Sequence, residues 1–118
     1  PKPGQSQVMN IIGDVKGKTC IIVDDIIDSG GTIVNAAKAL KDRGAKEVYV
    51  YITHGVLSGD AVKKIKNSVI KNLVITDTID NGEKVKIANN IEVLPISGLM
   101  GEAIKRISNS TSVSDLFK

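Results

Sequence analysis

Two hydrophobic patterns alternate along the chain. Short apolar runs rich in β-branched residues indicate buried strands, and segments whose apolar residues recur every three or four positions indicate helices. The predicted strands are residues 19–23, 48–52, 73–75 and 91–94, and the predicted helices are residues 32–43, 60–66 and 97–107. Gly44 is expected to end the first helix and Ser97 to cap the last. Strands and helices that alternate in this way form an α/β fold with a parallel sheet, whose ligands bind beyond the carboxyl ends of the strands.

Composition narrows the class of protein. Hydrophobic residues make up 42% of the 118 residues and charged residues 25%, which is typical of a globular domain and argues against disorder. Aromatic residues are only 3%, which favours an aliphatic parallel sheet and argues against a stacking platform for single-stranded nucleic acid. The net charge of +3 is mild and spread over the chain, and no segment resembles a membrane span or a signal peptide. We therefore expect a cytoplasmic protein with no nucleic-acid or membrane partner, and no disulfide, because Cys20 is the single cysteine.

Residues 24–32 carry the clearest chemical signal, because they follow the first predicted strand and lead into the first predicted helix. Gly30 and Gly31 allow tight backbone geometry and the close approach of an anion. Backbone N–H groups at the start of a helix favour phosphate, and Ser29 and Thr32 add hydroxyl donors. The segment therefore predicts a phosphate-binding turn.

Carboxylates flank this turn. Asp24 and Asp25 stand at the strand end, where they are suited to accept hydrogen bonds from sugar hydroxyls, and they are also weak candidates for Mg²⁺ ligands. The alternative is an ordinary strand–turn–helix connection in which Asp28 or Ser29 caps the helix. Two other nucleotide motifs are excluded: residues 17–19 end like a P-loop but precede a strand instead of following one, and the chain has no G-x-G-x-x-G.

Residues 24–32 resemble the motif that binds phosphoribosyl pyrophosphate (PRPP) in the type I phosphoribosyltransferase fold: an apolar strand, two acidic residues, two apolar residues, then Asp-Ser-Gly-Gly-Thr. Further segments resemble the ribose-phosphate diphosphokinases, or PRPP synthetases. They are residues 8–10, 13–15, 17–18, 53–59, 76–79, 103–104 and 112–117. The resemblance implies a Rossmann-like, three-layer phosphoribosyltransferase-type domain. It also implies an enzyme that makes PRPP and AMP from ribose 5-phosphate and ATP, with Mg²⁺.

Roles for individual residues follow from the resemblance alone. Asp24 and Asp25 would contact the ribose hydroxyls, and Asp77 would shape the rear of the ribose pocket. The 5-phosphate would be cradled by Asp28, Ser29, Gly30, Gly31 and Thr32. An allosteric nucleotide site between subunits would include Ser112, Ser114 and Phe117, in a homo-oligomer that the family suggests is a hexamer. His54, the single histidine, is interpreted as a structural turn residue.

Members of that family are more than twice as long as this chain and have two similarly folded halves. The chain resembles the C-terminal half, with residues 1–7 as a flexible remnant of a catalytic loop and residues 8–118 as the domain that binds ribose 5-phosphate. The basic run of that loop and the ATP-binding half are missing, so we expect no catalytic residue here and no activity of the isolated chain. Two alternatives are a phosphoribosyltransferase that uses PRPP and a non-catalytic subunit associated with PRPP synthetase.

Overall fold

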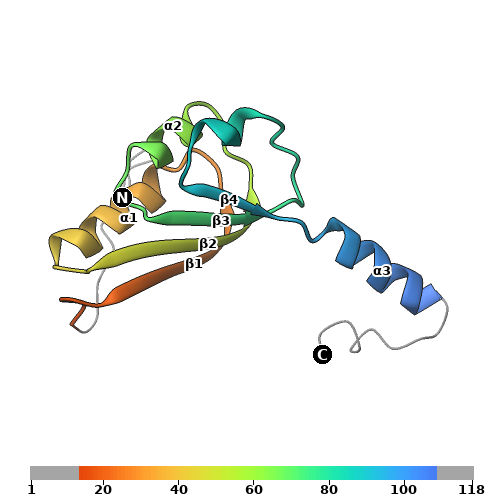
Figure 1. Cartoon of the computed structure of the whole chain (residues 1–118), viewed down its shortest axis with the longest axis horizontal. Helices are drawn as coiled ribbons and strands as arrows, with labels where there is room; N and C mark the ends of the chain where they lie inside the picture. The colour runs from red at the N-terminus through yellow and green to blue at the C-terminus, as the bar shows by residue number, and fades with distance from the viewer. Residues whose placement is uncertain (1–13, 109–118) are drawn as a thin grey trace, which may run out of the picture.

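Four parallel strands form one sheet, in the order in which they occur along the chain (Figure 1). The computed structural model describes residues 14–108. The strands are β1 (Thr19–Ile27), β2 (Glu47–Gly55), β3 (Asn72–Thr76) and β4 (Ile91–Leu94). Each strand pairs in parallel with the next, in a register that joins Ile22 to Val50 and Val50 to Leu73. The predicted parallel α/β sheet is therefore confirmed.

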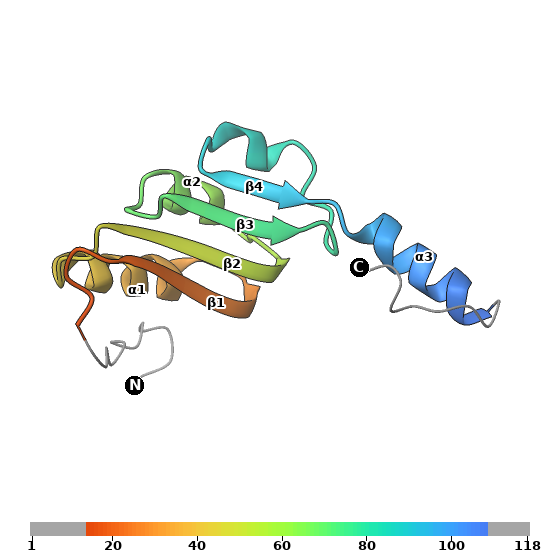
Figure 2. The same cartoon turned by 60° about the horizontal axis from the view of Figure 1, so that its bottom comes forward.

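Helices cover one face of this sheet. The helices are α1 (Gly31–Asp42), α2 (Ala61–Lys66) and α3 (Ser97–Ser108), with a 3-10 helix η1 (Lys84–Ile87) between β3 and β4. Figure 2 shows α1 and α2 on the same face, while α3 extends beyond the end of the sheet. Right-handed crossovers that all step in one direction place their helices on one side. Residues 14–108 thus supply two of the three layers that the resemblance implies.

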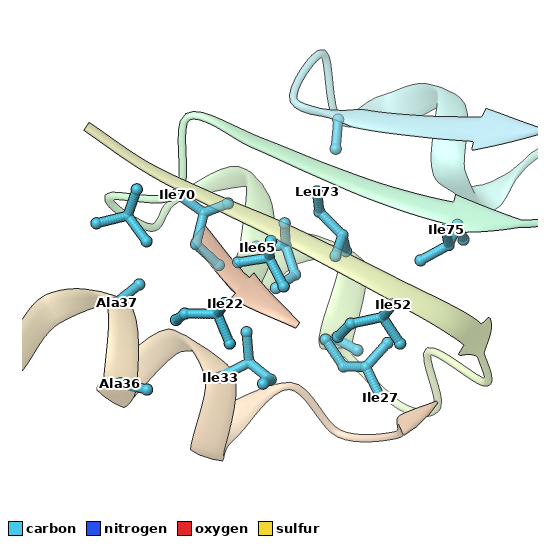
Figure 3. Close-up of a cluster of buried hydrophobic side chains, with 14 of the residues drawn as sticks. Ile22, Ile27, Ile33, Ala36, Ala37, Ile52, Ile65, Ile70, Leu73 and Ile75 are labelled. Carbon is cyan, nitrogen blue, oxygen red and sulfur yellow. The ribbon is translucent and has the colours of Figure 1, made fainter. Parts of the chain in front are cut away.

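The core lies between the sheet and the two helices and is purely aliphatic. Figure 3 shows Ile33 and Ala37 of α1 beside Ile22 of β1, and Leu73 of β3 farther along the same core. Alternate residues on the strands point to the opposite face, so Ile21 and Val23 remain 57% and 76% exposed. The low aromatic content is matched by a core of Ile, Val, Leu and Ala, which fits a sheet packed against short helices.

The ends of the elements agree with the sequence pattern at Gly44 and depart from it in two places. Gly44 follows the end of α1 with φ 93°, which confirms its predicted role. β1 continues past the acidic pair to Ile27, where it pairs with Gly55. The polar segment before β4 contains η1, which the pattern did not predict because a short 3-10 helix has no apolar face of its own.

Gly55 has less room for a side chain than the other glycines compared within residues 14–108. A Cβ atom added there would lie 2.6 Å from Cδ1 and 3.1 Å from Cγ2 of the buried Ile75. We expect Gly55→Ala to lower the free energy of unfolding by about 1–3 kcal/mol, the usual cost of overpacking a core. Urea denaturation followed by circular dichroism measures it. Gly98→Ala is the matched control, because nothing lies within 4 Å of a Cβ at that position. Equal stability of the two variants would contradict the steric argument.

Candidate functional site

The connection from β1 to α1 borders a pocket of about 280 Å³ at the carboxyl edge of the sheet. It is lined by Asp24, Ile26, Ile27, Asp28, Ser29, Gly30, Thr32 and Ile33. The structure therefore brings together all the predicted substrate residues except Asp25 and Gly31, which are not among the lining residues. The apolar members come from the end of β1 and the start of α1, so the pocket is built on two regular elements.

The turn presents the N-terminus of α1 without a side-chain cap. Gly30 occupies the N-cap position with φ 85°, in the left-handed region that favours glycine. The first intrahelical hydrogen bond runs from the N–H of Val34 to the carbonyl of Gly30 at 2.9 Å, so the three preceding N–H groups have no acceptor within the helix. No side chain caps α1, so the alternative with Asp28 or Ser29 as the cap is wrong. An uncapped helix N-terminus beside a pocket is suited to bind an anion.

The two adjacent aspartates occupy different environments. Asp24 lines the pocket, and its Oδ1 accepts a hydrogen bond of 2.7 Å from the backbone N–H of Asp25. Ile22 and Ile27 both belong to the core although an odd number of positions separates them. Strict strand alternation is therefore interrupted between them, in the stretch that holds the acidic pair.

The carboxylates of the pocket could bind Mg²⁺ only together with ligands from the substrate and water. Within residues 14–108 no group of three or more His, Cys, Asp or Glu side chains is placed to hold a metal ion. Mg²⁺ commonly uses one or two carboxylates together with substrate phosphates and water. Asp24 and Asp28 in the same pocket match that arrangement, in which the phosphates supply the remaining ligands.

A second polar cluster joins the ends of β2 and β3. His54 Nδ1 lies 2.8 Å from the hydroxyl of Thr78, and the hydroxyl of Thr76 donates to the carbonyl of Thr53 at 2.5 Å. These contacts connect two strand ends that are more than twenty residues apart in the chain. The interaction supports the interpretation of His54 as a structural residue.

Asp77 caps α3, which makes the predicted cap at Ser97 wrong. Its Oδ1 accepts hydrogen bonds from the N–H groups of Ile96 and Ser97, at 2.8 and 2.9 Å. Asp77 lines another pocket, of about 430 Å³, together with residues such as Asn81 and Val93, and is not among the residues that line the pocket at α1. The structure therefore gives Asp77 a capping role, and its implied place behind the ribose stays a prediction.

The cap at α3 should depend on pH. The backbone hydrogen bond from Ile96, followed by those from Ser97, holds the pKa of Asp77 below its usual 3.8. A lowered pKa in the folded state means that the stabilisation is present above the ordinary pKa and is lost as the pH falls through the lowered one. We expect the amide NMR signals of Ile96 and Ser97 to move upfield as acid removes the bonds. Asp77→Asn should abolish this titration. Unchanged signals in the wild-type chain down to about pH 2 would contradict the capping role.

The three residues predicted for the allosteric site lie outside the described residues: Ser112, Ser114 and Phe117. Residues 1–7, the predicted remnant of a catalytic loop, also lie outside them. In the part of the chain that the structure describes, no helix has the length and apolar character needed to span a membrane.

The parallel sheet and the strand–turn–helix pocket at its carboxyl edge define an α/β domain of the class that binds ligands beyond the ends of its strands. Comparison with known families agrees. The family described as "Phosphoribosyl synthetase-associated domain" matches residues 2–118, and the chain belongs to this family.

Several proteins similar to this chain have names that describe their function. Ribose-phosphate pyrophosphokinase from Hyphomonas neptunium is 60% identical over 117 residues, which is 99% of this chain and 38% of that protein. The enzyme of the same name from Buchnera aphidicola is 53% identical over 118 residues, again 38% of its length. The crystal structure of phosphoribosylpyrophosphate synthetase from Mycobacterium smegmatis is 38% identical, with a TM-score of 0.79 over 84% of this chain and 33% of that one. The chain thus spans less than two fifths of the relatives it matches.

Proposed function

We propose that this chain is the ribose 5-phosphate-binding domain of a ribose-phosphate pyrophosphokinase, corresponding to its C-terminal half over residues 8–118. The observation that carries the proposal is the uncapped N-terminus of α1 in a pocket that also holds Asp24 and Asp28. Such a pocket offers donors to a phosphate and acceptors to sugar hydroxyls. The identity of 60% to an enzyme named ribose-phosphate pyrophosphokinase supports the same substrate.

The reaction assigned to the whole enzyme moves a diphosphoryl group from ATP to the anomeric hydroxyl of ribose 5-phosphate and gives PRPP and AMP. Such transfers are accelerated mainly by positioning and by electrostatic stabilisation of the phosphates. In this chain the N–H groups of α1, with the hydroxyls of Ser29 and Thr32, would hold the 5-phosphate. Asp24 and, more weakly, Asp25 would accept hydrogen bonds from the ribose. Mg²⁺ would enter with the phosphates of ATP and neutralise part of their charge.

The groups that act on ATP are assigned to the other half of the enzyme and to its basic loop, of which residues 1–7 would be the remnant. Assembly into a homo-oligomer and an allosteric nucleotide site that includes Ser112, Ser114 and Phe117 belong to the same proposal. An active phosphoribosyltransferase and a non-catalytic subunit are less well supported. The relatives are named as pyrophosphokinases, and the predicted phosphate-binding turn, residues 24–32, leads into a helix without a side-chain cap. We call these residues the phosphate turn.

Calorimetric titration of the chain with ribose 5-phosphate, inorganic phosphate and ribose tests the proposal. We expect ribose 5-phosphate to bind more tightly than either of its two parts, because the pocket addresses both the phosphate and the sugar. We also expect no PRPP formation when the isolated chain is supplied with ribose 5-phosphate, ATP and Mg²⁺. Absence of binding at millimolar ribose 5-phosphate would contradict the assigned site, and turnover by the purified chain would contradict the assignment of the catalytic groups.

A further inference from the structure

Residues 56–59, which we call the support turn, follow β2 and lie against the phosphate turn. Three consecutive N–H groups of the support turn donate to two carbonyls at the end of β1. Val56 and Leu57 donate to Ile27 at 2.9 and 3.3 Å, and Ser58 donates to Asp28 at 3.0 Å. The backbone of the phosphate turn is therefore held by a segment that itself lines no part of the pocket.

Ser58 makes a second contact, to the side chain of Asp28. Its hydroxyl donates to Oδ1 of Asp28, so one residue holds both the carbonyl and the carboxylate of that aspartate. Asp28 lines the pocket and stands two positions before Gly30, the N-cap of α1. Aspartate is among the preferred capping residues, and its charge is favoured at a helix N-terminus. A freely rotating Asp28 carboxylate would compete with a phosphate for the same N–H groups.

The support turn is itself held in an uncommon conformation. Leu57 is buried and has φ 53°, and among the described residues it is the one non-glycine with positive φ. Such a residue costs roughly 1 kcal/mol or more and persists where its surroundings determine it. Lys84 Nζ donates to the carbonyl of Leu57 at 2.9 Å, and Asn81 Nδ2 donates to that of Gly55 at 2.8 Å. Side chains from the segment before η1 and from η1 thus fix the turn that presents Ser58.

We propose that Ser58 is a positioning residue for ribose 5-phosphate and acts through Asp28. Its hydroxyl keeps the Asp28 carboxylate away from the N-terminus of α1, so that the N–H groups stay open to the 5-phosphate. The same hydrogen bond withdraws part of the negative charge that would otherwise repel the phosphate dianion. This inference rests on the proposed function.

The test compares Ser58→Ala and Ser58→Thr in calorimetric titrations of the chain with ribose 5-phosphate. We expect Ser58→Ala to bind roughly tenfold more weakly, as for loss of a hydrogen bond to a charged group. Ser58→Thr keeps the hydroxyl and should bind like the wild type. Ser68→Ala is the matched control, because it also loses a hydrogen bond, 2.7 Å long to the carbonyl of Ile65, outside the pocket. Thermal unfolding of each variant confirms that the fold is retained.

The route through Asp28 is tested in the background Asp28→Asn. If Ser58 acts by restraining the carboxylate, Ser58→Ala should have little further effect once the charge is gone. An undiminished tenfold loss in that background would overturn the inference. So would wild-type affinity of Ser58→Ala, or loss of affinity in Ser58→Thr equal to that in Ser58→Ala. If Asp28→Asn binds too weakly to measure, the comparison of Ser58→Thr with Ser58→Ala decides whether the hydroxyl of Ser58 is required. A wild-type chain that binds no ribose 5-phosphate contradicts the proposed function itself, which distinguishes the two failures.

Discussion

Gly31→Val is expected to abolish ribose 5-phosphate binding and leave the fold intact. Gly31 is the first residue of α1, beside the lining residues Gly30 and Thr32. A β-branched side chain there narrows the approach of an anion to the N–H groups of the first turn. Binding should fall by at least roughly a hundredfold, since several charge-assisted hydrogen bonds are lost together. Calorimetry measures the affinity, and circular dichroism checks the secondary structure.

The backbone of Gly31 does not require glycine, which makes this variant a clean probe. Positive φ is found at Gly30 and not at Gly31, so a valine at position 31 avoids the strain of a left-handed residue. Gly101→Val is the matched control, because Gly101 is also helical and nothing lies within 4 Å of a Cβ there. If Gly31→Val binds ribose 5-phosphate as well as Gly101→Val does, the helix N-terminus is not the phosphate site.

The neighbouring glycine should respond differently. A Cβ at Gly30 would lie 3.7 Å from Cδ1 of Ile65, an ordinary contact, so space does not forbid a side chain. The obstacle to a side chain at position 30 is the φ of 85°, because a residue with a Cβ adopts this backbone conformation only at a cost of about 1–2 kcal/mol. Sequence alone indicates that the pair of glycines matters. Only the backbone geometry shows that the positive φ, and with it the strain of an added side chain, belongs to Gly30 and not to Gly31.

The aliphatic runs were sufficient to predict all four strands, because apolar runs of β-branched residues are typical of parallel strands. Helices cover only one face of the sheet within residues 14–108, so Ile21 and Val23 remain exposed on the other. The extension of β1 to Ile27 was missed because aspartate is uncommon in strands. Pairing of this end with β2 depends on backbone hydrogen bonds and on the burial of Ile27, which no local pattern encodes. The sequence of this strand end is polar at Asp24 and Asp25, but in the folded chain the end is paired with β2 and Ile27 is buried.

Contacts between residues distant in sequence account for the parts of the site that the sequence does not predict. Asp77 caps α3 across about twenty residues, and Ser58 contacts Asp28 across thirty. The positive φ of Leu57 has no sequence signal, because leucine has no preference for that region. Residues 53–59 resemble a segment of the PRPP synthetases, but this similarity does not indicate what the residues contact. The contacts that explain this similarity, between the support turn and the phosphate turn, appear only in the three-dimensional structure.

Asp24→Ala and Asp25→Ala should have unequal effects on ribose 5-phosphate binding. Asp24 lines the pocket and its carboxylate is already oriented by the N–H of Asp25, whereas the side chain of Asp25 is not among the lining residues. Loss of a hydrogen bond between a sugar hydroxyl and a carboxylate costs about 1.5–3 kcal/mol. We therefore expect Asp24→Ala to weaken binding roughly tenfold to a hundredfold, and Asp25→Ala to weaken it much less.

The dependence on Mg²⁺ separates two ways in which the pair could act. A carboxylate that contacts the sugar directly contributes equally with and without the ion, whereas one that holds Mg²⁺ contributes only when the ion is present. Titrations of both variants with ribose 5-phosphate, repeated at increasing Mg²⁺ and at saturating EDTA, distinguish these cases. We expect the loss in Asp24→Ala to persist in EDTA, because Asp24 lies where the sugar hydroxyls are proposed to bind. If Asp24→Ala keeps wild-type affinity under every condition, the ribose contact belongs to another residue, and the acidic pair loses its proposed chemical role.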